Sequence, residues 1–143
     1  MSQLTDPVER LREINKMAAF NRWCGIEVVS ARPGEAEIAM PWRQEVGQYA
    51  GFLHAGLVGA LIDTACGFAA VTMVGRVLAS HYSVNCLRPA VGERFVARAR
   101  VVKHGHSMVF TACELYAQGS DSGEKLVATG ETLLSVVKDE AVA

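Results

Sequence analysis

The sequence predicts a single α+β domain in which one sheet of about six strands packs around a buried helix, with another helix at the N-terminus. Three observations lead to this prediction: a capped amphipathic segment near the start, a nearly uncharged segment at 55–75, and four alternating polar and apolar segments after it. The 143 residues fit one domain, 1–143, with a core at about 20–137.

The first expected element is a helix that begins at Pro7 and ends near Trp23. Asp6 is a suitable N-cap residue, and Glu9 completes a capping-box pattern. Apolar residues then recur at helical spacing, and Gly25 is a suitable stop signal.

A β-hairpin is expected next, with strands at 26–30 and 36–40 joined by the Pro33-Gly34 turn. Residues 41–52 fit a loop. Beyond the apolar segment, further strands are expected at 80–87, 94–103, 108–118 and 125–137. Strands that are adjacent in sequence favour antiparallel pairing.

Residues 55–75 carry one charge, Asp63, in 21 residues, which is long enough to span a bilayer. Asp63 lies near the middle, where a carboxylate costs about 2.5–3.5 kcal/mol to insert. Four glycines also interrupt the stretch. We therefore expect a helix from about His54 to Gly75, buried nearly all round in a soluble protein, and no membrane partner.

Charge and cysteine content exclude several function classes. The 14 Lys and Arg against 15 Asp and Glu give a net charge of −1, with no general attraction to nucleic acid. The first seven residues lack an apolar signal-peptide segment, so we expect a cytoplasmic location. We also expect no cofactor. The cysteines have no metal-ligand spacing and suit buried thiols in a reducing compartment: Cys24, Cys66, Cys86 and Cys113.

Asp63 is the strongest candidate for chemistry. A carboxylate inside a buried apolar helix is desolvated, which raises its pKa unless partners compensate. Groups with perturbed pKa values are common in functional sites. The alternative is a structural Asp63 that caps a neighbouring helix or faces a solvent channel.

His54 stands at the start of the same helix. The amides of Ala55 and Gly56 in its first turn have no intrahelical acceptor, and together with the helix dipole they favour an anion or a polarised carbonyl oxygen. The alternative is an ordinary helix N-terminus with His54 as a polar cap.

Helix geometry separates the two candidates. Nine residues at about 1.5 Å each place His54 and Asp63 about 13 Å apart along the axis and on opposite faces. They can meet only if a second copy packs its helix antiparallel beside the first. Gly59 and Ala60 permit such an approach, although packing inside a curled sheet also accounts for them.

Other motifs point less clearly to chemistry. Gly-x-Ser-x-Gly and Walker motifs are absent from the sequence. His104-Gly105-His106 fits a hairpin turn better than a metal site, because no third ligand is evident. Four cations suit either a phosphate-binding patch or a solvated strand face: Arg88, Arg98, Arg100 and Lys103.

A set of short motifs, in the right order over about residues 20–137, resembles the hotdog-fold acyl-CoA thioesterases of the phenylacetic-acid-degradation (PaaI-like) type. That family has His-Gly-Gly at the start of its central helix and an acid nine residues after the His. The matching segments here are 51–56, 61–63, 67–69, 87–90, 103–106 and 126–130.

The resemblance implies a six-stranded antiparallel sheet wrapped around a central helix, in homodimers that commonly pair into homotetramers. It implies hydrolysis of an acyl-CoA at the dimer interface. By the family's pattern, the amide of Ala55 polarises the thioester carbonyl beside His54. Asp63 of the other subunit then acts as general base or nucleophile.

The chain departs from the family pattern at three positions. The first glycine of the motif is Ala55, and a polar residue six before the His, often Asn, is Gln48. The Ser or Thr that often positions the water falls on Ala79, so Ser80 or Ser83 is expected to take that role. The expected substrate-binding set is Gly56, Ser80, Ser83, Arg88 and His106.

Three functions compete for this pattern. The first is acyl-CoA hydrolysis, the second is binding of acyl-CoA or another acyl ligand without turnover, and the third is a hydratase or dehydratase. The third typically pairs Asp and His in a motif that is absent here. The acyl group stays open, because the aromatic residues near the helix start fit either an apolar pocket or the core: Trp42, Tyr49, Phe52 and Phe68.

Overall fold

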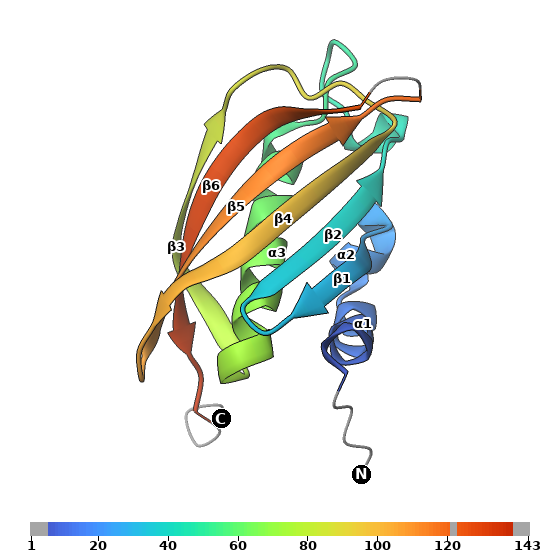
Figure 1. The fold of residues 1–143 in the computed structure, drawn as a ribbon. Helices are drawn as coiled ribbons and strands as arrows, with labels where there is room; N and C mark the ends of the chain where they lie inside the picture. Colours follow the sequence, from blue (N-terminus) through green and yellow to red (C-terminus); the bar gives the residue numbers. More distant parts are fainter. Residues whose placement is uncertain (1–5, 121–122, 139–143) are drawn as a thin grey trace.

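The computed structural model of the protein describes residues 6–120 and 123–138. Its six strands form one antiparallel sheet in the order β1-β2-β4-β5-β6-β3. The sheet curves around the helix α3 (Ala55–Val74), as Figure 1 shows. The strands are β1 (Glu27–Arg32), β2 (Glu35–Pro41), β3 (Val77–Cys86), β4 (Arg94–His104), β5 (Met108–Gln118) and β6 (Glu124–Val136). The α+β prediction is confirmed; the ends of the predicted domain, 1 and 143, and most of the segment tested for a signal peptide lie outside the described residues.

The N-terminal segment forms two helices, where the sequence predicted one. Helix α1 (Pro7–Met17) and helix α2 (Ala19–Cys24) are separated by Ala18, whose backbone is extended. Asp6 caps α1 as predicted and accepts from the Val8 N–H at 3.0 Å. The side chain of Glu9 pairs with Arg12 instead of closing a capping box.

The break between the helices is accompanied by a pair of asparagine side chains. Asn15 donates to the Ile26 carbonyl at 2.8 Å and accepts from Asn21 at 2.9 Å. These bonds hold α2 and the start of β1 against α1. Apolar periodicity does not predict them, because it registers only the spacing of the buried side chains.

Helix α3 is buried on one side and open on the other. Its buried residues contact the concave face of the sheet and are Val58, Gly59, Leu61, Ile62, Ala65, Cys66, Phe68, Ala69 and Ala70. On the other side, Gly56 is exposed, and Ala60, Asp63 and Gly67 are half-buried. The prediction of a helix buried nearly all round is therefore wrong for a single chain, because the sheet covers only one side. The helix has the length and composition of a membrane span, but over half of it packs inside the protein.

The two edges of the sheet differ. Strand β1 is covered by α1, whereas β3 forms the other edge and most of its ten residues are exposed (Figure 1). Edge strands present unpaired backbone N–H and C=O groups to a partner strand. The uncovered edge lies beside the open side of α3.

Candidate active site

The N-terminus of α3 carries one free amide. His54 is the N-cap residue, and its Nδ1 accepts a hydrogen bond from the Gly56 N–H at 2.8 Å. Among the hydrogen bonds of residues 6–120 and 123–138, none uses the Ala55 N–H. The amide of Gly56, which the sequence suggested as a second donor, is engaged by the cap. Ala55 alone therefore offers an N–H to a ligand.

The same hydrogen bond fixes the tautomer of His54. Because Nδ1 accepts, the proton of the neutral ring is on Nε2, which is left to donate outward. Gly56 leaves room for this cap, since a Cβ at Gly56 would lie 3.0 Å from Nδ1 of His54 and the imidazole would have to shift slightly. The absence of a side chain at Gly56 thus favours this position of the imidazole.

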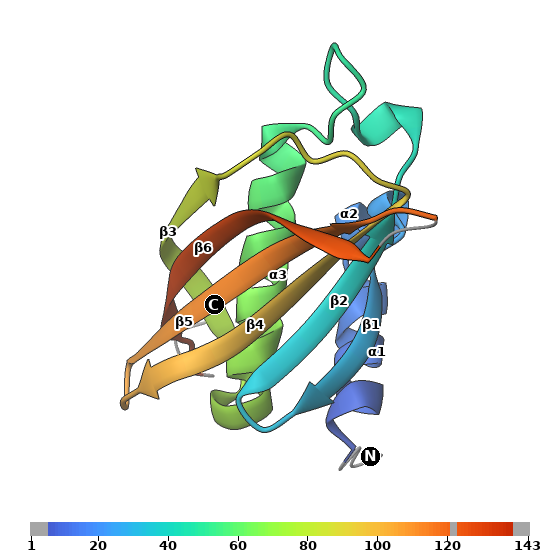
Figure 2. The ribbon, with the colours of Figure 1, turned by 45° about the horizontal axis from the view of Figure 1, so that its top comes forward.

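The loop before α3 is held at several points. Gln48 donates its N–H to the Phe52 carbonyl at 2.8 Å, and Leu53 donates to the Ala90 carbonyl at 3.0 Å. Figure 2 shows this loop projecting beyond the start of α3. The side-chain oxygen of Gln48 accepts from the Ala50 N–H, which leaves its NH₂ group available to donate. Gln48 can therefore still serve as the donor that the sequence predicted.

An open hollow of about 570 Å³ lies in front of this helix start. His54, Ala55 and Gln48 line one side, and Arg88 lies on the segment that forms the other. The full lining is Gln48, Tyr49, Phe52, Leu53, His54, Ala55, Val58, Cys86, Leu87, Arg88, Pro89, Ala90 and Val127. Four of the predicted site residues thus share one hollow.

Asp63 is half-buried on α3 and does not line that hollow. Burial raises the pKa of its carboxyl group above the ordinary value of 3.8. No hydrogen bond or ion pair of Asp63 occurs within the described part of the chain. Within one chain, Asp63 and His54 therefore lie apart, as the helix geometry predicted.

The remaining predicted residues lie elsewhere. Ser80 bonds to the Ser135 hydroxyl at 2.5 Å, and Ser83 lines a hollow on the outer face of the sheet. His106 is in the β4–β5 hairpin, beside the C-terminal end of α3 (Figure 1). The 20 residues of α3 make this end about 30 Å from His54. In one chain, these three residues do not join the helix-start hollow.

Tyr82 is a residue that the sequence reasoning missed. Its half-exposed ring packs over Gly59 of α3, so that a Cβ at Gly59 would lie 3.2 Å from Tyr82 Cε2. The signal was the alternation of β3, which turns Tyr82 inward and its neighbours His81 and Ser83 outward.

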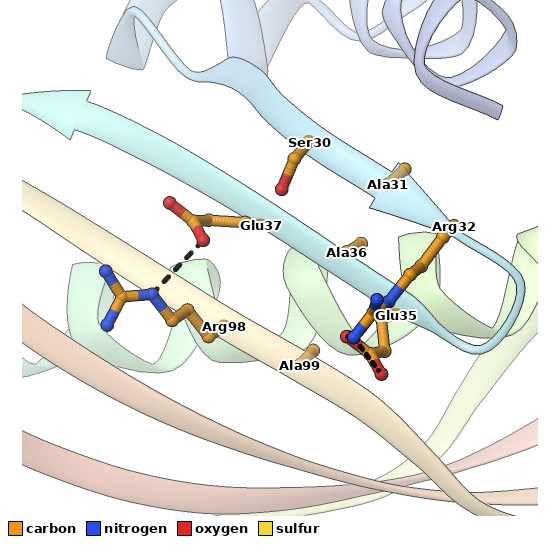
Figure 3. A pocket seen from close by; sticks show the side chains of 8 residues that line it. All are labelled: Ser30, Ala31, Arg32, Glu35, Ala36, Glu37, Arg98 and Ala99. Atoms are coloured by element: carbon orange, nitrogen blue, oxygen red, sulfur yellow. Dashed lines mark hydrogen bonds and ion pairs between the residues drawn. The ribbon is translucent and has the colours of Figure 1, made fainter. Parts of the chain in front are cut away.

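The predicted cationic patch is divided by the fold. Arg98 donates to Glu37 at 3.1 Å and pairs with Glu124, and these bonds raise the pKa of its guanidinium. Figure 3 shows Arg98 and Glu37 at a hollow of about 330 Å³ that also includes Ser30. Arg98 thus belongs to a solvated strand face with its charge balanced, while Arg88 lies near the helix start with no ion pair among residues 6–120 and 123–138.

Comparisons with known proteins agree with this geometry. The thioesterase superfamily matches residues 50–124, just over half of the chain. Human acyl-coenzyme A thioesterase 13 is 32% identical over 135 residues, which cover 89% of this chain and 94% of that protein. A crystal structure of a thioesterase family protein from Silicibacter pomeroyi has a TM-score of 0.86 and 34% identity, with 90% of this chain and 96% of the other covered.

The Escherichia coli PaaI protein, from the phenylacetic acid degradation operon, has a TM-score of 0.83 at 20% identity. That match covers 92% of this chain and 94% of PaaI, and it bears on the fold. The fold with these matches defines a hotdog-fold enzyme of the thioester hydrolase class. The chain belongs to the thioesterase superfamily, and the resemblance to PaaI-like thioesterases seen in the sequence is confirmed.

Proposed function

We propose that this protein hydrolyses an acyl-CoA or aryl-acyl-CoA thioester to the free acid and CoA. The observation that carries the proposal is the free Ala55 N–H at the mouth of the helix-start hollow. An amide fixed at a helix N-terminus stabilises the negative charge that develops on a thioester oxygen during attack. His54, which caps the same turn, holds that amide in place.

A second copy of the chain supplies the carboxylate in this proposal. The uncovered β3 edge packs next to α3, so two copies related by a two-fold axis can pair the β3 edges and the open sides of α3 at once. Gly56, Ala60 and Gly67 have little side-chain bulk, so antiparallel α3 helices can approach closely. Each site then combines Ala55 of one copy with Asp63 of the other.

The reaction follows from these groups. Asp63 removes a proton from a water molecule whose oxygen forms a bond to the thioester carbon. The carbon–sulfur bond then breaks, and the thiolate leaves and takes up a proton. Burial favours a protonated Asp63, so its carboxylate is a stronger base than an exposed aspartate. Direct attack by Asp63 to form an anhydride, followed by hydrolysis, uses the same placement.

The hollow suits the polar part of such a substrate. The Gln48 NH₂ group and the Arg88 guanidinium are donors for carbonyl and phosphate oxygens of CoA. Tyr49 and Phe52 provide apolar surface in the same hollow, which fits an aryl or medium-length acyl group. We place His106 of the second copy among the candidate CoA contacts, because antiparallel pairing reverses the direction of its chain.

Ala79 favours a second candidate, binding of an acyl-CoA without turnover. It faces the α3 side of β3, paired with the buried Leu134, and has no hydroxyl to hold water. The two candidates share the ligand and differ in whether thiol is released.

Assaying free-thiol release from a panel of acyl-CoAs separates the two candidates. We expect the protein to hydrolyse at least one acyl-CoA and to sediment as a dimer. Binding without thiol release across the panel would favour the second candidate, and an active monomer would contradict the shared site. Pairing of dimers into a tetramer and a cytoplasmic location are part of the same proposal. Sedimentation and cell fractionation test them.

A further inference from the structure

The β3 residues that the sequence suggested for holding the attacking water do not supply a hydroxyl on the α3 side of the sheet. Ala79 has no hydroxyl, and the hydroxyls of Ser80 and Ser83 lie on the outer side of the sheet. Asp63 can take a proton from a water but cannot by itself fix the direction of the oxygen lone pair. Such fixing requires a second hydrogen-bonding group near Asp63.

Tyr82 is the β3 residue whose hydroxyl faces α3. A Cβ placed on Gly59 would lie 3.4 Å from Tyr82 Oη, so the hydroxyl lies directly against the helix at Gly59. Asp63 is one turn further along α3, about 6 Å in rise and about 40° around the axis from Gly59. Within the described residues, Tyr82 Oη has no hydrogen-bond partner.

The residue opposite Tyr82 on the neighbouring strand is a buried threonine. Thr132 of β6 is the cross-strand partner of Tyr82, is 1% exposed, and has an Oγ1 atom with no hydrogen-bond partner among the described residues. Buried hydroxyls are normally hydrogen-bonded to protein or to ordered water. The Thr132 hydroxyl faces the buried Cys66 thiol, whose pKa is lowered by Cys113 most and by Thr132 as well. The hydroxyl of Tyr82 is therefore the β3 group left to contact a water near Asp63.

The level of Gly59 is also the centre of the proposed dimer. If Ala55 of each copy lies beside Asp63 of the other, two antiparallel helices cross midway between positions 55 and 63, at position 59. Tyr82 packs at this level, about 6 Å of helix rise from both functional positions. Its hydroxyl is therefore beside the gap between the free amide and the carboxylate.

We propose that Tyr82 is a positioning residue for hydrolysis, a role that rests on the function proposed above. Its Oη accepts one hydrogen of the nucleophilic water, while Asp63 takes the other as a proton. The lone pair of the water oxygen then points at the thioester carbon. Tyr82 keeps its own proton throughout, so it changes the geometry of the attack and adds no charge.

The test is the substitution Tyr82→Phe, which keeps the ring against Gly59 and removes only the hydroxyl. We expect kcat to fall about 3- to 10-fold, the scale of one lost hydrogen bond, with KM changed less than about twofold. Tyr116→Phe is the matched control, because it removes a hydroxyl that bonds to Glu114 at 3.0 Å on β5. We expect wild-type kcat from that control.

Gly59→Ala provides an independent variant. Its methyl group presses on the Tyr82 ring and displaces a hydroxyl that is still present, so we expect a lower kcat and an unchanged KM. Sedimentation and thermal unfolding of each variant establish whether the dimer is intact. A wild-type kcat in Tyr82→Phe, or a loss that comes with dissociation of the dimer, would overturn the role of Tyr82. An inactive wild-type protein would overturn the proposed function itself.

Discussion

The two sides of α3 are built from different kinds of residue and serve different purposes. The side against the sheet carries Leu61, Ile62 and Phe68, of which Leu61 and Ile62 are fully buried. The open side carries Gly56, Asp63 and Gly67, which bury little apolar surface within one chain. The first set stabilises the chain by itself. In the proposed dimer the second set lies against another copy, and one helix then contains both the core and half of a site.

Asp63→Asn is expected to have the largest effect on function. We expect a folded dimer that still binds acyl-CoA and has a kcat at least about 10²-fold lower, because a general base is removed. Ile62→Val, on the sheet side, is the matched control and should cost about 1 kcal/mol of stability while kcat stays the same. Steady-state kinetics and thermal unfolding measure both. Near-normal hydrolysis by Asp63→Asn would remove Asp63 from the mechanism.

Gly67→Leu should separate folding from pairing. A Cβ on Gly67 meets no atom within 4 Å in one chain, so the side chain fits the isolated protomer. Helices pack at axis distances of about 8–10 Å, and a leucine on the open side resists an approach at the short end of this range. We expect a folded monomer with activity reduced about tenfold or more, and a smaller effect for Gly67→Ala. A fully active Gly67→Leu dimer would show that this side of α3 does not form the contact.

A mixed dimer tests whether each active site combines His54 of one chain with Asp63 of the other. In a dimer of one His54→Ala chain and one Asp63→Asn chain, one composite site receives both substitutions and the other receives none. With random pairing, half of the dimers are mixed, so co-refolding two inactive variants should restore about a quarter of the wild-type activity. Verified mixed dimers without recovery would mean that Asp63 works with groups of its own chain.

The sequence predicted the sheet side of α3 and the order of the elements well, because apolar periodicity reports burial directly. The limits of β5 and the caps of α3 at His54 and Gly75 followed from local signals. Local apolar spacing did not predict the break at Ala18, where Asn15 and Asn21 on either side bond to each other. The alternation of β3 accounts for the inward direction of Tyr82, but no local signal predicted the bulge between Ala79 and His81, which changes the alternation at Ser80.

In the candidate site, too, the sequence predicted what local geometry determines and missed what depends on side-chain and tertiary contacts. The free amide of Ala55 and the isolation of Asp63 from His54 both followed from helix geometry, which is local. The loss of the Gly56 amide to His54 depended on one rotamer, which sequence spacing does not fix. The position of Tyr82 over Gly59 depended on the register between β3 and α3, which is a tertiary contact.

The smallest expected effect concerns the stability contributed by the open side of α3. Burial raises the folded-state pKa of Asp63 above its ordinary value of 3.8, so the folded chain binds that proton more tightly than the unfolded chain does. This contribution is fully present below the ordinary pKa and is lost as pH rises through the folded-state pKa. At neutral pH the ionised Asp63 therefore opposes folding, and Asp63→Asn should be more stable than wild type. Thermal unfolding across pH should show this gain at neutral pH and its decrease toward acid, because a protonated carboxyl group and the asparagine amide that replaces it are both uncharged. An Asp63→Asn protein that is less stable at neutral pH would mean that the carboxylate has a favourable partner in the assembled protein.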